Sequence, residues 1–202
     1  MRWNACNSLM MTIPALIVYI GQITHAQTVT DFDGNIYPVF QAGKDLWMGE
    51  NLRVSHDPKG NPIEFYAIQN PYMDSCRYGL LYDWSTATDS IEAPGTQGIC
   101  PDGWHLPTDA EWDSLTEWAG GVDIAGIALK KSGQDKFEAI MAGNYNPIQK
   151  LHSYFGEHAY FWTSDSYSLQ SAWMRHLGHV RKNIDRSTVK KHYGFSVRCV
   201  RD

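Results

Sequence analysis

The chain has 202 residues, of which 43% are apolar and 19% are charged, and its net charge is −5 at neutral pH. This composition is typical of a globular chain long enough to build a hydrophobic core, and it excludes intrinsic disorder. The mild acidity gives no electrostatic reason to expect nucleic acid or an anionic membrane as a partner.

The first 26 residues are predicted to be a secretory signal peptide. Arg2 supplies a positive start, a mostly apolar run follows from Leu9 to Ile20, and Thr24-His25-Ala26 places small residues where a signal peptidase cuts. The run is too short to cross a hydrocarbon layer about 30 Å thick. We therefore expect cleavage after Ala26, a single domain over residues 27–202, no membrane span, and a secreted, periplasmic or cell-surface location.

Strands are predicted at the start of the domain, over residues 28–31, 35–41 and 46–48, with Asp33-Gly34 as the turn between the first two. Residues 78–84 lead into a short helix that ends near residue 88 and that Asp83 can cap. Thr108-Asp109-Ala110-Glu111 is a capping box, and Pro107 prevents an earlier helix start. The helix it opens ends at Gly120-Gly121, and a second helix is expected over residues 123–131.

After the helices the pattern changes to short strands. They are expected over residues 137–142, residues 160–164, and a hairpin of 172–177 with 180–185 around Gly178-His179. In the last strand, residues 194–200, Phe195, Val197 and Cys199 point to one side. The order of strands, two helices and strands predicts an α+β fold with an antiparallel sheet, in which the first and last strands pair.

Export would place the chain where cysteines pair. Cys76, Cys100 and Cys199 remain after the leader, so one cysteine is left over. Because Cys100 and Cys199 each lie beside a predicted core segment, we predict a disulfide between them. Cys76 is then the odd thiol.

Six segments, in this order, resemble the Fibrobacter succinogenes major paralogous domain family: Val29–Tyr37, Trp47–Leu52, Tyr78–Trp84, Ile99–Thr108, Phe161–Ser164 and Tyr193–Asp202. The family occurs in exported proteins of Bacteroidetes and Fibrobacteres, and it implies no defined reaction. It often carries an additional cysteine pair just upstream of the Tyr-Gly-x-Leu-Tyr segment. This chain keeps only Cys76 there, which supports the pairing of Cys100 with Cys199.

Residues 103–108, followed by Glu111-Trp112, are similar to a segment of the formylglycine-generating-enzyme group, with His105 where that group usually has arginine. This resemblance implies a C-type-lectin-like fold, with antiparallel sheets, two flanking helices and paired terminal strands. The group's enzymes hold copper with a late cysteine pair, whereas here only Cys199 is late. We therefore predict no enzymatic activity, no catalytic residues and no cofactor; an oxidoreductase of this type with a relocated active site is the alternative.

No metal-ligand set is predicted either. His176 and His179 are expected to flank a hairpin turn, and the acidic loops of calcium-dependent lectins are missing. A structural calcium ion held by backbone and Asp or Asn oxygens remains compatible with the sequence.

Two surfaces are candidate ligand sites. The loop over residues 143–158 carries aromatic and amide side chains that suit a sugar or a protein partner, or that simply cover the core; these are Asn144, Tyr145, Tyr154 and Phe155. A basic cluster suits an anionic glycan, or forms a solvated face; it comprises Arg181, Lys182, Arg186, Lys190, Lys191 and His192. We predict an exported binding or surface-structural module that recognises a protein or polysaccharide through long loops.

Overall fold

The computed structural model describes residues 27–67, 75–130 and 136–202. The predicted signal peptide lies outside these residues. The first strands follow the expected hairpin: Asp33-Gly34 lies in the turn, and the Asp31 carboxylate accepts a hydrogen bond from the Asn35 amide at 2.9 Å. The five-stranded sheet has the order β1-β2-β3-β10-β4. Its strands are β1 (Thr28–Thr30), β2 (Ile36–Ala42), β3 (Asp45–Met48), β10 (Val200–Arg201) and β4 (Trp104–His105).

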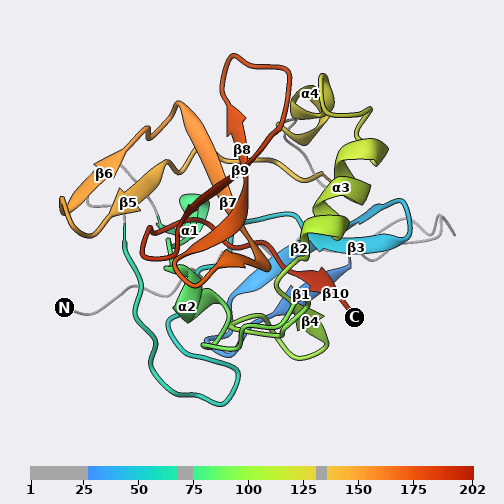
Figure 1. Ribbon diagram of the computed structural model, residues 1–202. Coiled ribbons are helices and arrows are strands. Elements are labelled where there is room, and N and C mark those ends of the chain that lie inside the picture. The colour runs from blue at the N-terminus through green and yellow to red at the C-terminus, as the bar shows by residue number, and fades with distance from the viewer. Residues whose placement is uncertain (1–26, 68–74, 131–135) are drawn as a thin grey trace, which may run out of the picture.

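Two smaller sheets complete the β structure among the described residues, and all paired strands are antiparallel (Figure 1). One is the three-stranded sheet of β7 (His158–Ser168), β8 (Ser171–Gly178) and β9 (Asp185–Lys190). The other is the hairpin of β5 (Asn144–Asn146) and β6 (Leu151–Ser153). The helices are short: α1 (Ser75–Tyr78), α2 (Trp84–Ala87), α3 (Asp109–Trp118) and α4 (Ala125–Leu129). The α+β class with antiparallel sheets is confirmed.

The helix starts are where local chemistry places them. The amide of Glu111 donates to the Thr108 hydroxyl at 3.2 Å, and the Thr108 amide donates to the Glu111 carboxylate at 2.7 Å. The predicted capping box therefore forms, satisfying two backbone groups that the first helical turn leaves free. The carboxylate of Asp83 caps α2 through the Thr86 amide at 2.7 Å, also as predicted.

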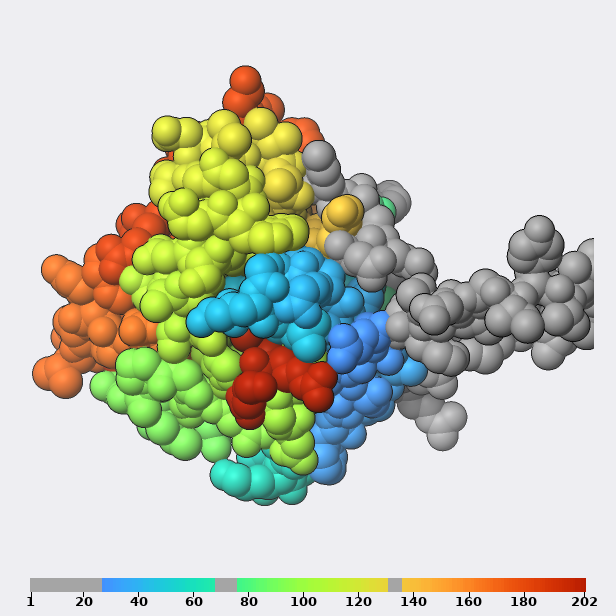
Figure 2. All heavy atoms as spheres, turned by 90° about the vertical axis from the view of Figure 1, so that its right-hand side faces the viewer, coloured from blue at the N-terminus to red at the C-terminus, as the bar shows by residue number. Residues whose placement is uncertain are grey.

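The predicted pairing of the first and last strands is wrong. β10 pairs with β3 and with β4, while β1 pairs only with β2 among the described strands. β2 and β3 thus separate the chain's first strand from its last within one sheet. Figure 2 shows the C-terminal residues at the surface, between the early strands and the segment that precedes α3.

The expected strand over residues 137–142 is also wrong, because its backbone groups find partners elsewhere. The carbonyls of Phe137 and Glu138 accept from the buried guanidinium of Arg198, and the Ala139 amide donates to the Leu129 carbonyl at 2.7 Å. A segment whose polar groups are satisfied in this way needs no neighbouring strand.

The second arm of the predicted hairpin begins later than expected. β9 starts at Asp185, so residues 180–184 form a connection and not a strand. The ammonium of Lys130 donates hydrogen bonds to the carbonyls of Gly178 and His179, each at 2.9 Å. A Cβ atom on Gly126 would lie 2.6 Å from the Asn183 carbonyl, so only glycine lets this connection lie against α4.

The core has two parts, one under α2 and one under α3 and α4. Edge-to-face aromatic contacts dominate the second part: the ring centroids of Trp47 and Trp112 are 5.1 Å apart, and those of Phe137 and Phe161 are 5.5 Å apart. The segment over residues 194–200 runs through the core, and every one of its residues is buried. The expected alternation between a buried and an exposed side is therefore not found.

Candidate functional site

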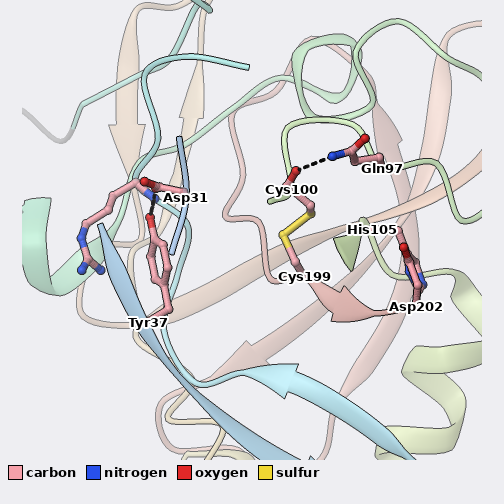
Figure 3. The surroundings of a disulfide bond; sticks show 8 residues. Asp31, Tyr37, Gln97, Cys100, His105, Cys199 and Asp202 are labelled. Atoms are coloured by element: carbon pink, nitrogen blue, oxygen red, sulfur yellow. Dashed lines mark hydrogen bonds and ion pairs between the residues drawn. A yellow bond between two sulfur atoms is a disulfide. The ribbon is translucent and has the colours of Figure 1, made fainter. Parts of the chain in front are cut away.

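The predicted disulfide is present. Cys100 and Cys199 are bonded with their Cα atoms 5.9 Å apart, and both are fully buried. Figure 3 shows the bond joining the loop ahead of α3 to the segment that enters β10. The prediction that Cys76 is an odd thiol is wrong, because Cys76 is disulfide-bonded as well.

His105 holds the C-terminus beside this disulfide (Figure 3). Its Nδ1 lies 2.6 Å from a carboxylate oxygen of Asp202, and its Nε2 lies 2.8 Å from Glu111. The hydrogen bond that His105 donates to the Glu111 carboxylate is the main reason that the pKa of His105 is raised, with Asp202 adding to it against the effect of burial. His105 therefore links α3 to the chain end, which is a structural role.

A hollow of about 200 Å³ lies beside Cys100. Its most buried carboxylate, Asp31, already accepts from the Tyr37 hydroxyl at 2.5 Å and from the Asn35 side chain at 2.9 Å. Because that carboxylate is used by the fold, it has little capacity left for a ligand. Phe32, Val54 and His56 belong to the hollow's lining.

At the rim of this hollow, Asp33, Ser55 and His56 contact one another without forming a catalytic triad. The Asp33 carboxylate lies 2.6 Å from Nδ1 of His56, and the Ser55 hydroxyl lies 3.2 Å from the same nitrogen. A triad needs the acid and the nucleophile on different ring nitrogens, so that the histidine can pass a proton between them. Here the Ser55 hydroxyl and amide both donate to Asp33, which fixes a turn.

The four residues of the predicted loop surface do not form one exposed patch. Asn144 is buried, and its side chain is hydrogen-bonded to Tyr160. Phe155 packs on Tyr78, with ring centroids 4.8 Å apart, whereas Tyr154 is 52% exposed. Of the four residues predicted here, Tyr145 and Tyr154 therefore present a ring near the surface.

Tyr145 belongs to a cluster of tilted aromatic rings at the β5–β6 hairpin. Its centroid lies 4.3 Å from that of Tyr66 and 4.6 Å from that of His152. These three residues, which we name the aromatic platform, line a hollow of about 220 Å³ with Phe65 and Ala67. Sequence reasoning missed Tyr66 because it lies 79 residues before Tyr145 in the chain. Tyr66 and its neighbours reach the hairpin only through tertiary folding.

Backbone geometry holds the platform in place. The amide of Tyr145 donates to the Gly194 carbonyl at 3.0 Å, and the Gly194 amide donates back at 2.8 Å. A Cβ atom at position 194 would lie 2.6 Å from the ring of Tyr66. The glycine thus admits the ring to the place where it stacks.

His152 adds an unsatisfied polar atom to the platform. Its Nδ1 is buried and has no hydrogen-bond partner among the described residues. Burial lowers the pKa of His152, partly opposed by a hydrogen bond to the Ala67 backbone. Because Nδ1 makes no bond, the bond to Ala67 uses Nε2 as donor to the carbonyl, which leaves Nδ1 as an acceptor.

The predicted basic cluster is largely neutralised by the fold. Arg186 forms an ion pair with Asp109 at 2.6 Å, Lys191 with Glu92 at 2.6 Å, and Arg181 with Asp185 at 3.4 Å. Lys190 donates to Gln170 at 3.0 Å, while Lys182 and His192 are exposed. The guanidinium of Arg186 also covers Trp173, at 3.4 Å from the ring centroid. Most side chains of the basic cluster are therefore used in contacts within the protein.

Asp109 forms ion pairs with two arginines, Arg186 and Arg175. Burial alone would raise the pKa of the Asp109 carboxyl, but hydrogen bonds and charge from Arg186 and Arg175 outweigh it and lower the pKa. Arg175 is 1% exposed and also donates to Asp113 at 2.7 Å. Arg186 therefore helps to fix the start of α3 on the three-stranded sheet, which limits its availability to an anionic glycan.

Within the three described ranges, no group of three or more His, Cys, Asp or Glu side chains is arranged to hold a metal ion. No helix in the same part of the chain is long and apolar enough to span a membrane.

Antiparallel sheets, short capped helices and a buried disulfide define a disulfide-linked α+β protein. Comparison with protein families shows which one: residues 40–201 match the Fibrobacter succinogenes major domain, and the chain belongs to that family. No curated protein and no solved structure matches the chain.

Proposed function

We propose that this protein is an exported, non-catalytic binding module with a C-type-lectin-like fold, and that it recognises a polysaccharide outside the cytoplasm through the aromatic platform. The observation that carries the proposal is the cluster of the tilted rings of Tyr66, Tyr145 and His152 around a surface hollow. Aromatic rings cover the apolar C–H face of a sugar, while polar atoms beside them receive its hydroxyl groups.

The size and chemistry of the hollow favour a sugar over a protein partner. At about 220 Å³ it is smaller than the usual pocket for a small ligand, roughly 300–1,000 Å³, so it suits one unit of a longer chain. A protein partner needs on the order of 800 Å² of surface on each side. Its aromatic lining supplies the flat apolar faces on which a sugar ring packs.

The fold and the location are supported by separate features. α3 packs against β7 and β8 and contacts α4, which supports the flanking helices expected of a C-type-lectin-like chain, whereas the pairing of the terminal strands expected of that fold is not found among the described strands. A disulfide in the core suits an oxidising compartment. Isolating the protein from its native host and measuring its mass tests export: a mature chain that starts at Gln27 is expected, and an intact leader in a cytoplasmic fraction would overturn this part.

The absence of catalysis is supported by the use of the reactive side chains in structure. Cys199, the late cysteine, is spent on the core disulfide, and His56 contacts Ser55 and Asp33 through a single nitrogen. Oxygen consumption by the purified protein with a thiol substrate and bound copper would overturn this part of the proposal and favour an oxidoreductase.

The binding test is a glycan array followed by titration of the best polysaccharide. Removing one ring from the platform, Tyr145→Ala or Tyr66→Ala, should weaken binding about five-fold, because a lost stacking contact costs about 1 kcal/mol. Tyr145→Phe should keep most of the affinity. Tyr167→Ala is the matched control, since Tyr167 is an exposed ring on β7, outside the platform.

Each variant is compared with the wild type by thermal unfolding, so that loss of fold is not taken for loss of binding. Absence of any glycan hit, or equal affinity in wild type and both alanine variants, would overturn the polysaccharide proposal. Capture of a surface protein that is lost with Tyr145→Ala would instead reassign the platform to a protein partner.

A further inference from the structure

Two histidines from neighbouring strands meet on one face of the three-stranded sheet, away from the platform residues. Nδ1 of His158 on β7 lies 2.6 Å from Nε2 of His176 on β8, and the ring centroids are 4.7 Å apart. In the strand register His158 is opposite Gly178, which has no side chain, and Tyr160 is opposite His176. The ring of Tyr160 stacks on His176 at 4.6 Å and holds its plane.

A carboxylate fixes the tautomer of His176. Asp185 is its register partner on β9, and the Asp185 carboxylate lies 3.4 Å from Nδ1 of His176. A carboxylate only accepts, so the ring proton sits on Nδ1 and the lone pair sits on Nε2. Asn183 donates to the other oxygen of Asp185 at 2.7 Å, which orients the carboxylate.

In many metal sites a histidine is arranged in the same way: one ring nitrogen donates its proton to a carboxylate, and the other ring nitrogen binds the metal. The carboxylate holds the ring in position and makes its free nitrogen a better ligand. With its proton held on Nδ1 by Asp185, the ring of His176 keeps a lone pair on Nε2, the nitrogen that faces His158. Tyr154, 5.2 Å from His158 by ring centroids, is half exposed, so the pair lies close to solvent.

From this geometry we infer that His158 and His176 together bind one divalent ion of the late first transition series, such as Ni²⁺, Cu²⁺ or Zn²⁺, which prefer imidazole nitrogen. Two nitrogens that are each about 2.0–2.1 Å from one ion are roughly 3 Å apart, so the rings need to separate by well under about 1 Å. The proton on Nδ1 of His158 moves to its Nε2, and no proton is lost. Water fills the remaining positions.

The inference goes beyond the proposed function, since the site uses no platform residue. With two protein ligands it has fewer than the three or four of structural and catalytic zinc sites, so the ion is exchangeable.

The test is calorimetric titration of the untagged, chelator-treated protein with Ni²⁺ at pH 7.5. One equivalent is expected to bind to the wild type, and His158→Gln and His176→Gln should each lose this binding. Asp185→Asn should weaken it by about 10–100-fold, because the second-shell acceptor is lost. His192→Gln, which changes an exposed histidine elsewhere on the surface, should bind as the wild type does.

A spectroscopic measurement on the wild type keeps the test independent of how well the variants fold. With Cu²⁺ and histidine labelled with ¹⁵N, electron paramagnetic resonance should show coupling to two imidazole nitrogens. No binding to the wild type, coupling to fewer than two imidazoles, or unchanged affinity in both glutamine variants would overturn the inference. Loss of binding in His192→Gln would overturn it as well.

Discussion

Removing the disulfide between Cys100 and Cys199 should cost a large share of the protein's stability. The change to make is the double variant Cys100→Ala with Cys199→Ala, because a single variant would leave one free thiol in the core. The two cysteines are 99 residues apart in sequence. Closing a loop of about 100 residues in the unfolded chain corresponds to about 4.7 kcal/mol in the chain-entropy account, and measured values are typically about 2–4 kcal/mol.

We therefore expect a loss of about 3 kcal/mol in the free energy of unfolding, out of a total of roughly 5–15 kcal/mol for a native protein. For a chain of this size that corresponds to a fall in Tm of about 6–12 °C. Urea unfolding, followed by tryptophan fluorescence and by circular dichroism, gives the free energy and shows whether the transition stays two-state.

Chemical reduction of the wild type is a different perturbation, because Cys76 is disulfide-bonded too. A loss below about 1 kcal/mol in the double variant would refute the loop-closure reasoning, and it would mean that packing alone holds the last strand in the sheet.

Three further predictions concern polar contacts. Thr108→Ala should lower the free energy of unfolding by about 1 kcal/mol, with Thr108→Ser close to wild type, in urea unfolding; an equal loss in both would contradict the capping role. Arg198→Met should cost about 3–5 kcal/mol, because removing this fully buried guanidinium leaves the Asn51 side-chain carbonyl and the backbone carbonyls of Met48, Phe137 and Glu138 unpaired. A Tm within a few degrees of wild type would refute this. Because the pKa of His105 is raised in the folded protein, His105 stabilises the fold fully below pH 6.5, and this stabilisation is lost as the pH rises through the folded-state pKa. The pKa of Glu111 is lowered, so Glu111 stabilises the fold above pH 4.5, and this stabilisation is lost as the pH falls through its folded-state pKa. Thermal unfolding from pH 4 to 9 should therefore show an alkaline decline that His105→Gln removes, and an unchanged decline in that variant would contradict the assignment.

Signals that act over a few residues were predicted well. The turn at Asp33-Gly34, the capping box at Thr108 and the cap at Asp83 depend only on neighbours within about four residues, and all are present. The disulfide is a long-range contact, yet its partners were predictable because each cysteine lay beside a segment with the composition of a core.

Features that depend on which distant groups meet were missed. The change to short strands and loops after the helices suggested a strand over residues 137–142, but Arg198 takes two of its carbonyls. The cationic run near the end of the chain suggested a free basic surface, but Asp109 and Glu92 lie opposite Arg186 and Lys191. No local pattern records such partners, because an ion pair depends on the spatial approach of its two groups.

The amino-acid sequence by itself determined the family, the α+β class, the helix starts and the core disulfide, because each rests on short segments or on cysteine placement. The tertiary structure alone decided that Tyr66 joins Tyr145 and His152, and that His158 meets His176. The reason is physical: a binding surface is made by side chains that strand register and backbone contacts bring together, and separation along the chain does not specify that approach.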